Sequence, residues 1–149
     1  MVKLQYEYNK NTNKLKDQNM KLVDDLLKKS KENIEAAKIL FNNKLYNASA
    51  NRSYYAAFHA AIASMNNANI IKISHTELMS HKSVQAIFVK ELILKRKIFS
   101  SNIKSYLTDL LRVRNIADYH AKGISKKIAS RQLNKSVEFV QRLAEEIEK

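Results

Sequence analysis

Residues 46–67, YNASANRSYYAAFHAAIASMNN, decide the fold of this chain of 149 residues. Wound as a helix, this segment carries alanines and other apolar residues on most of its faces, and such a helix is buried on most of its faces. The many alanines let neighbouring helices approach closely. The segment therefore predicts a central helix that other helices surround.

The composition favours helices for the rest of the chain as well. There is no proline and one glycine, while 45% of the residues are hydrophobic. A sheet-rich fold needs such turn residues at its hairpins, whereas helices tolerate their absence. The length suits one well-buried core. We therefore expect a single all-α domain over residues 19–149, an up-and-down bundle of four to five helices.

Periodic apolar residues and capping residues give the other helices. Apolar residues recurring at three- and four-residue steps predict a first helix over residues 19–44. Ser80 predicts the start of a third helix that reaches about residue 94, and Ser125 the start of a fifth. A fourth helix is predicted over residues 101–121, with Gly123 as the place where it stops.

Two segments are not predicted to be helical. Residues 1–18 are polar and are predicted to form a frayed tail, although the alternation of Tyr6 and Tyr8 would also suit a short strand. Residues 66–79 are predicted to connect two helices. Three isoleucines of this connection are placed to plug it to the core: Ile70, Ile71 and Ile73.

No stretch predicts a membrane span or a secretory signal. The longest nearly apolar run, residues 54–65, is broken by His59 and is shorter than the roughly 20 residues that a spanning helix needs. The absence of cysteine excludes a disulfide framework and a thiolate nucleophile. We expect a cytoplasmic protein.

The net charge of +13 is concentrated in one part of the chain. Between residues 90 and 131 there are 11 basic residues and three acidic ones. A positive field of this kind attracts a polyanion such as RNA. An acidic partner protein and an ordinary lysine-rich surface remain alternatives.

The basic region contains the segment LLRVRNIADYH, residues 110–120. Arg114 falls within the apolar face of the fourth helix, and an unpaired buried charge costs several kcal/mol. Its guanidinium must therefore end in a pocket, in a subunit interface or in an ion pair, and Asp118 at i+4 offers such a pair. On a straight helix His120 points roughly 120° away from Arg114. The two converge on one phosphate only if the helix loosens near Gly123 or a second copy of the chain completes the site, which predicts a homodimer.

Three polar residues of the central helix also share one direction. Arg52, Tyr55 and His59 stand at i, i+3 and i+7. Polar side chains on a buried helix need partners. They either line the same cleft as Arg114 or form a structural hydrogen-bond network within the bundle.

Residues 51–61, NRSYYAAFHAA, resemble the second-helix signature of a branch of the HEPN superfamily, small helical-bundle proteins of prokaryotes. Residues 80–82 and 114–119 resemble two further landmarks of that branch. The ribonuclease motif of the superfamily is an arginine, usually followed by a polar residue, and a histidine four to six positions beyond the arginine. Arg114, Asn115 and His120 match this motif.

The resemblance implies a metal-independent endoribonuclease without a cofactor, commonly the toxin of a toxin–antitoxin pair or a part of a defence system. His120 would act as general acid or base on the ribose 2′-OH. Arg114 would stabilise charge on the phosphorane, and Asn115 would orient His120 or hold a phosphate oxygen. Six residues are expected to support catalysis or to bind RNA: Arg52, Tyr55, His59, Arg112, Asp118 and Tyr119.

Two departures from the pattern leave a second interpretation open. Some toxins of the superfamily carry a tyrosine two residues after the histidine, where a partner nucleotidyltransferase attaches nucleotides, but this chain has Lys122 there. The branch that this chain resembles often lacks the final histidine. The alternative is a catalytically silent HEPN bundle that binds or regulates a nucleotidyltransferase or another partner. His75 and His81 lie on or near a loop without acidic companions, so no zinc site is expected.

Overall fold

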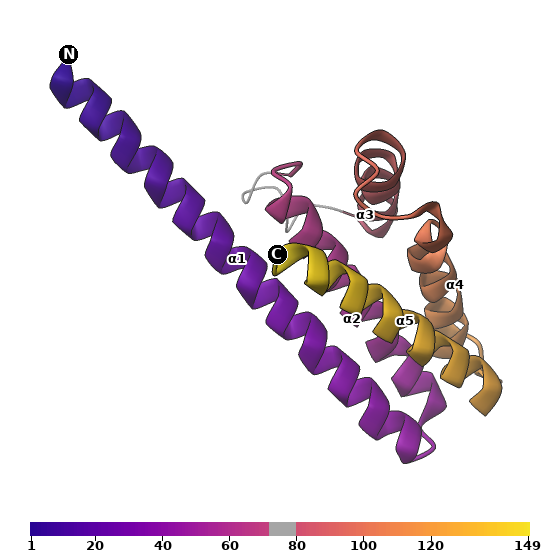
Figure 1. The fold of residues 1–149 in the computed structure, drawn as a ribbon. Helices are drawn as coiled ribbons and strands as arrows, with labels where there is room; N and C mark the ends of the chain where they lie inside the picture. Colours follow the sequence, from indigo (N-terminus) through magenta and orange to yellow (C-terminus); the bar gives the residue numbers. More distant parts are fainter. Residues whose placement is uncertain (72–79) are drawn as a thin grey trace.

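The computed structural model describes residues 1–71 and 80–149, and this part of the chain contains helices and connections but no strand. A π-helix, η2 (Phe88–Lys95), continues α3, and a 3-10 turn, η3 (Ser101–Ile103), precedes α4. Figure 1 shows the resulting all-α bundle. Its α-helices are α1 (Val2–Asn42), α2 (Tyr46–Asn67), α3 (His81–Ile87), α4 (Tyr106–Tyr119) and α5 (Lys126–Ile147).

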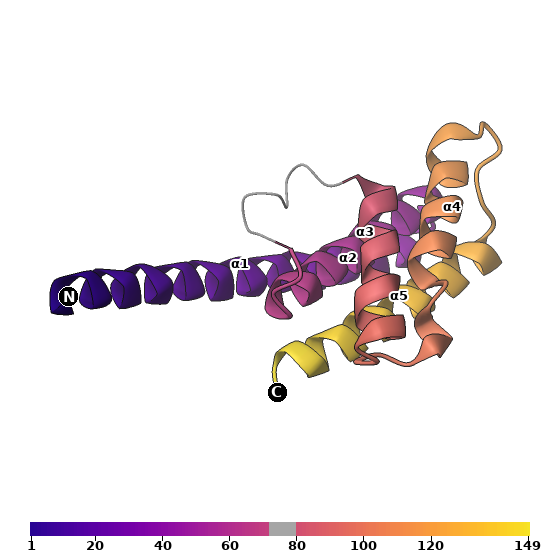
Figure 2. The same cartoon turned by 90° about the horizontal axis from the view of Figure 1, so that it is seen from above.

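Helix α2 is the centre of the bundle, as predicted. It packs against α1, α4 and α5, which lie around it in Figures 1 and 2. Tyr54 and Met65 are completely buried. The same is true of five alanines distributed around the helix: Ala56, Ala57, Ala60, Ala61 and Ala63.

Buried serines hold the neighbouring helices close to α2. Ser30 of α1 donates a hydrogen bond to the carbonyl oxygen of Ala56 at 2.6 Å, and Ser136 of α5 donates to that of Ser53 at 2.6 Å. A buried hydroxyl needs a partner, and a carbonyl on the facing helix is within reach only when the two backbones are close. These bonds therefore depend on the small residues of α2.

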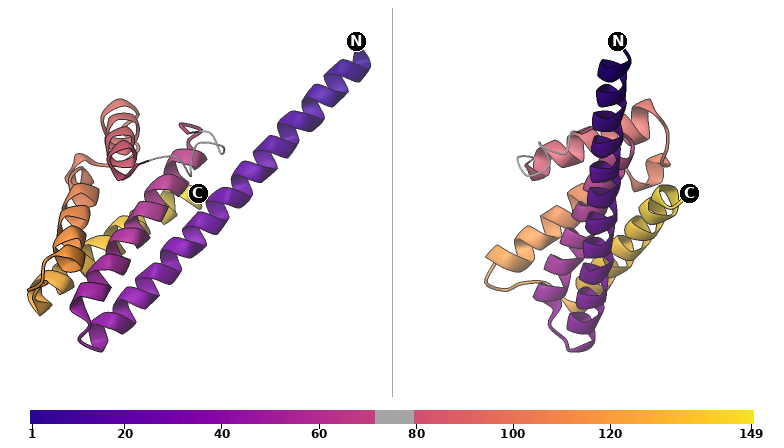
Figure 3. Two further views of the ribbon diagram at one scale, coloured as in Figure 1. Left: turned by 180° about the vertical axis from the view of Figure 1, so that it is seen from behind. Right: turned by 90° about the vertical axis from the view of Figure 1, so that its left-hand side faces the viewer.

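Helix α1 is longer than its apolar pattern indicates. The expectation of a frayed tail or a short strand over residues 1–18 is wrong, because these residues form the first turns of α1. Every residue from 1 to 18 is exposed, and Figure 3 shows this end extending beyond the bundle. The segment contains no glycine or proline to interrupt the helix, which buries its first hydrophobic residue at Val23.

The two helix starts predicted from Ser80 and Ser125 are confirmed, whereas the fourth helix begins at Tyr106 and not at residue 101. Ser80 accepts a hydrogen bond from the backbone N–H of Ser83, and Ser125 accepts one from that of Ile128. The fourth helix is shorter than expected, since α4 ends at Tyr119 and residue 121 lies exposed outside it.

The connection after α2 is described only in part. Ile70 and Ile71 pack against the core, as expected. Ile73 and His75 lie outside the described residues. None of the described helices is both long and apolar enough to cross a membrane.

Candidate functional site

Arg114 is the centre of the candidate site. Its side chain is only 14% exposed, on the face of α4 that packs toward α2. Its Nε lies 2.9 Å from Oδ2 of Asp118, so the predicted ion pair at i+4 is present. Nη1 donates to Oδ1 of Asn115 at 3.1 Å, and Nη2 donates to the hydroxyl of Tyr55 at 2.9 Å. The guanidinium is thus held by partners on two helices.

A polar network continues from Asp118 across α2 to α1. Asn51 donates to Oδ2 of Asp118 at 2.8 Å. The Oδ1 of Asn51 accepts two hydrogen bonds from Arg52, whose Nη1 also donates to Oδ1 of Asn33 at 3.1 Å. Arg52 therefore belongs to a structural network, as one of the two predictions for it required, and this network ends at Arg114.

The ring of Tyr55 lies between the two arginines. The guanidinium carbon of Arg52 is 5.0 Å from the ring centre and that of Arg114 is 5.3 Å from it. Both distances suit cation–π attraction, which weakens the mutual repulsion of two cations in one place. Tyr119, at the end of α4, lies 5.8 Å from the guanidinium of Arg114 and is mostly exposed. These rings place an aromatic surface beside the Arg114 guanidinium.

His81 joins this cluster from α3. Its ring centre is 4.8 Å from that of Phe58 and 6.2 Å from that of Tyr55, and its Nδ1 is hydrogen-bonded to the hydroxyl of Tyr54. Burial raises the pKa of Tyr54. Burial, and then the charge of Arg114, lower the pKa of His81. Both shifts favour the neutral forms, so this hydrogen bond joins a neutral phenol and a neutral imidazole.

His59 lies on the same side of α2, but its imidazole is hydrogen-bonded to the backbone of the same helix. Its Nδ1 is 2.7 Å from the carbonyl oxygen of Tyr55, and its ring packs against Tyr55 and Phe58. Burial lowers the pKa of His59. This favours a structural role for His59 within the cluster.

His120 and Arg112 lie apart from the Arg114 cluster. The imidazole of His120 is exposed and makes no hydrogen bond or ion pair with the described residues. Its backbone ψ of 129° marks the point where the chain leaves the helix. Arg112 points elsewhere and pairs with Asp109 at 2.8 Å. Within a single chain, only two of the three motif residues lie together, Arg114 and Asn115.

The arrangement suits binding of a phosphate group. A guanidinium has five N–H donors. In Arg114, Nη1 donates to Asn115 and Nη2 to Tyr55, while the buried Nε is ion-paired with Asp118 without a hydrogen bond to the described residues. The second N–H of each terminal nitrogen remains for a ligand, in an orientation that the protein has already set. Among the described residues, no three His, Cys, Asp or Glu side chains lie close enough to hold a metal ion.

Sequence reasoning did not identify three members of the cluster. Asn33 and Asn51 complete the network around Arg52, and Tyr54 orients His81. One signal was available, because Asn33 interrupts the apolar stripe of α1 next to Ile34 and a polar residue there needs a partner. Nothing in the sequence indicated the position of His81 against the rings of α2.

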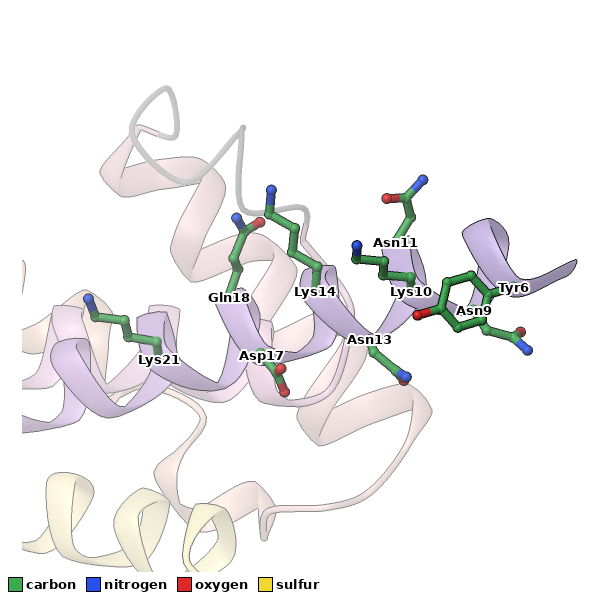
Figure 4. Close-up of a pocket in the computed structure, with 9 residues that line it drawn as sticks. All are labelled: Tyr6, Asn9, Lys10, Asn11, Asn13, Lys14, Asp17, Gln18 and Lys21. Carbon is green, nitrogen blue, oxygen red and sulfur yellow. The ribbon is translucent and has the colours of Figure 1, made fainter. Parts of the chain in front are cut away.

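A hollow along the exposed part of α1 is not part of this site. Figure 4 shows side chains from residues 6–21, which come from the exposed part of α1 alone and point in different directions. Among the described residues, this hollow is lined by a single helix. It therefore lacks the converging walls of a binding pocket.

Comparison with known proteins agrees with the fold. Residues 23–147 match a family model described as "HEPN domain". A protein of Methanocaldococcus jannaschii named "Putative toxin MJ0605" is 31% identical over 121 residues, which cover 81% of this chain and 85% of that protein. A protein of Gloeobacter violaceus named "UPF0332 protein glr0978" is 32% identical over 95 residues, which cover 64% of this chain and 70% of that protein.

Proposed function

The chain belongs to the HEPN domain family, and we propose that it is an RNA-cleaving member, a metal-independent endoribonuclease that acts as the toxin of a toxin–antitoxin pair or in defence. The observation that carries the proposal is the held guanidinium of Arg114. Asp118, Asn115 and Tyr55 fix its orientation and leave two N–H donors unused. A cation that is already oriented stabilises the charge of a phosphorane without further reorganisation.

The chemistry needs a base and an acid besides this cation. A base takes the proton of the ribose 2′-OH, and the O2′ forms a bond to phosphorus. The bond from phosphorus to O5′ then breaks, and an acid gives a proton to the departing O5′. The products are a 2′,3′-cyclic phosphate and a free 5′-hydroxyl, so neither metal nor water enters this step. His120 is assigned the proton transfers.

The separation of His120 from Arg114 supports a site made by two copies of the chain. In one chain the imidazole is exposed and free of side-chain partners, while Arg114 is enclosed. A two-fold axis beside α4 would bring two copies of the motif together and would supply two imidazoles, one as base and one as acid. We therefore include a homodimer in the proposal.

The test is cleavage of RNA by the purified protein in EDTA. The wild type is expected to produce 2′,3′-cyclic phosphate ends. Arg114→Ala and His120→Ala are each expected to lower the rate by at least about 100-fold, the usual contribution of a positioned acid–base or charge-stabilising group. Arg114→Lys keeps a cation beside Asp118 but loses the guanidinium fork, so it is expected to fold and to lose most of the activity.

The controls remove similar groups from other places. Arg131→Ala removes an exposed arginine of α5, and Lys122→Ala changes an exposed residue close to His120; both are expected to keep full activity. Unchanged cleavage by His120→Ala would overturn the mechanism. Activity that disappears in EDTA and returns with a divalent metal would overturn it as well.

The isolation of His120 also favours the second candidate, a silent HEPN bundle that binds a nucleotidyltransferase or another partner. In that case purified wild-type protein cleaves no RNA, with or without a metal. The Arg114 network then serves stability alone, and Arg114→Ala lowers the midpoint of unfolding without changing any cleavage.

A further inference from the structure

A groove with basic walls runs between the α3–η2 segment and the start of α4. Its volume is about 840 Å³. Lys82 and Lys90 stand on one wall, and Lys104 stands just before α4 on the other. The remaining lining residues are three with hydroxyl groups, Ser101, Ser105 and Thr108, and four others, Gln85, Ala86, Val89 and Leu94.

Within the described residues, no carboxylate pairs with these three lysines. The lining contains no Asp or Glu, and none of the three ammonium groups forms an ion pair with the described residues. Some lysines elsewhere on the described surface are paired, as Lys31 is with Glu148 and Lys135 with Asp109, and many are not; these three differ in lining one groove together. Cations facing one another across a groove repel unless an anion lies between them. The groove therefore favours an anionic occupant.

The other lining groups match a phosphodiester strand better than an acidic helix. Hydroxyl groups donate to phosphate oxygens, which make up much of the contact between proteins and nucleic acid backbones. The apolar side chains Ala86, Val89 and Leu94 offer surface for sugars and bases between the phosphates. Lysines on both walls suit a single strand that lies along the groove, because its charges are exposed on more than one side.

The groove leads to the Arg114 cluster. Lys82 follows His81, whose ring packs against Phe58 and Tyr55. On the other wall Thr108 lies about two helical turns before Asn115, on the same side of α4. Helices α3 and α4 run in opposite directions in Figure 2, so the segment that leads into α4 lies at the end of the groove where η2 ends, away from the start of α3 that carries His81.

We propose that this groove, here called the lysine groove, binds the phosphate backbone of the RNA strand that flanks the bond to be cleaved. The proposal rests on the proposed function in taking RNA as the substrate. It adds the path of the strand, from Arg114 past Lys82 to Lys90 and Lys104, and it makes affinity for RNA dependent on length and on salt.

The test measures binding of a fluorescent, fully 2′-O-methylated RNA of about 12 nucleotides, which lacks the attacking 2′-OH and is not cleaved. The lysine-groove variant carries Lys82→Gln, Lys90→Gln and Lys104→Gln. The matched control removes the same three charges from the exposed part of α1, with Lys10→Gln, Lys14→Gln and Lys21→Gln.

The lysine-groove variant is expected to bind at least about tenfold more weakly at low salt. Its plot of log Kd against log salt is expected to be less steep by about two, since each phosphate contact on a single strand contributes about 0.7 to the slope. The control is expected to stay close to the wild type. Equal weakening of both variants would mean that only net charge matters, and it would overturn the proposal.

A second measurement separates this proposal from the proposed function. A dinucleotide has one phosphate, the one that is attacked at Arg114, and leaves none for the groove, so the lysine-groove variant is expected to cleave it at the wild-type rate and to cleave the long RNA more slowly. If RNA binding depends on the three lysines but the protein cleaves no RNA, the lysine groove is supported as an RNA-binding site. The proposed ribonuclease activity is then overturned. Failure of the wild type to bind RNA at low salt overturns the lysine groove, and an acidic protein becomes its occupant.

Discussion

Tyr55 contacts both arginines of the candidate site, using its ring for the two of them and its hydroxyl for Arg114. Its ring lies within 5.3 Å of the guanidinium carbons of Arg52 and Arg114, and its hydroxyl accepts a hydrogen bond from Arg114. Among the described residues, neither arginine has another aromatic ring so near. The orientation of Arg114 therefore depends on a residue of a different helix.

Two substitutions separate the ring from the hydroxyl. Tyr55→Phe keeps the ring and is expected to lower the free energy of unfolding by about 1–2 kcal/mol, the value of a hydrogen bond to a charged group. Tyr55→Ala also removes the packing and the cation–π contacts and is expected to lower it by about 3 kcal/mol or more. Urea denaturation measures both. Equal losses in the two variants would show that the ring contributes nothing.

Asp109 predicts how stability changes in acid. Burial raises the pKa of its carboxyl, but hydrogen bonds from Lys135, Arg112 and Gln132 outweigh this and bring the pKa to about 2. The folded chain therefore binds a proton less readily than the unfolded chain. The stabilisation is present above the ordinary pKa of 3.8 and is lost as the pH falls through about 2.

The size of this effect is measurable by substitution. Between pH 5 and pH 2 the wild type is expected to lose about 1–2 kcal/mol more unfolding free energy than Asp109→Asn does, after allowance for a side chain that is 25% exposed. Urea denaturation at several pH values gives the comparison. Parallel pH profiles for the two proteins would assign the acid sensitivity to other carboxyl groups.

At the scale of elements, one turn determines where the chain goes after α4. Gly123 has a φ of +70°, and a Cβ on it would lie 2.5 Å from Nδ2 of Asn47. Movement of Asn47 away from it would break the hydrogen bond that its Oδ1 accepts from the backbone N–H of Ile124 at 2.9 Å. This contact ties the turn that follows His120 to the start of α2.

Gly123→Ala is expected to lower the free energy of unfolding by about 2 kcal/mol, about half from the positive φ and half from the clash. In an Asn47→Ala background the clash is absent, so the same substitution is expected to cost only about 1 kcal/mol. A double-mutant cycle measured by thermal or urea denaturation gives the coupling. Equal losses in both backgrounds would contradict the clash.

At the scale of the molecule, the exposed end of α1 divides the chain into a compact bundle and a projecting helix (Figure 1). Residues 1–18 are exposed, and the first hydrogen bond of α1 to a distant element of the described chain runs from Asn19 to the carbonyl oxygen of Asn66. The HEPN match begins only at residue 23. The bundle thus has its core without the projecting part.

Deletion of residues 2–15 is expected to change the unfolding free energy by less than about 0.5 kcal/mol, because the removed side chains are all exposed. Circular dichroism at fixed wavelength during urea titration measures this. A deletion that extends to residue 27 is the control, since it removes the buried Val23 and Leu27 and is expected to destabilise the bundle strongly. A marked loss from the short deletion would show that the projecting helix supports the fold.

Local patterns in the sequence determined much of this structure. The apolar surface of residues 46–67 required a central helix, and Ser80 and Ser125 marked two helix starts. The pair of Arg114 and Asp118 followed from a spacing of four residues. Each of these features depends on the geometry of a single helix, which its own sequence specifies.

The composition of the site was decided only by the tertiary structure. Arg114 meets Tyr55 across 59 positions of the chain, Asp118 meets Asn51, and His81 packs against the rings of α2. The end of α4 at Tyr119, which leaves His120 outside the helix, goes together with a turn held by Asn47 from α2. Contacts of this kind depend on how closely and at what angle helices pack, and packing is a property of all the side chains at the interface together.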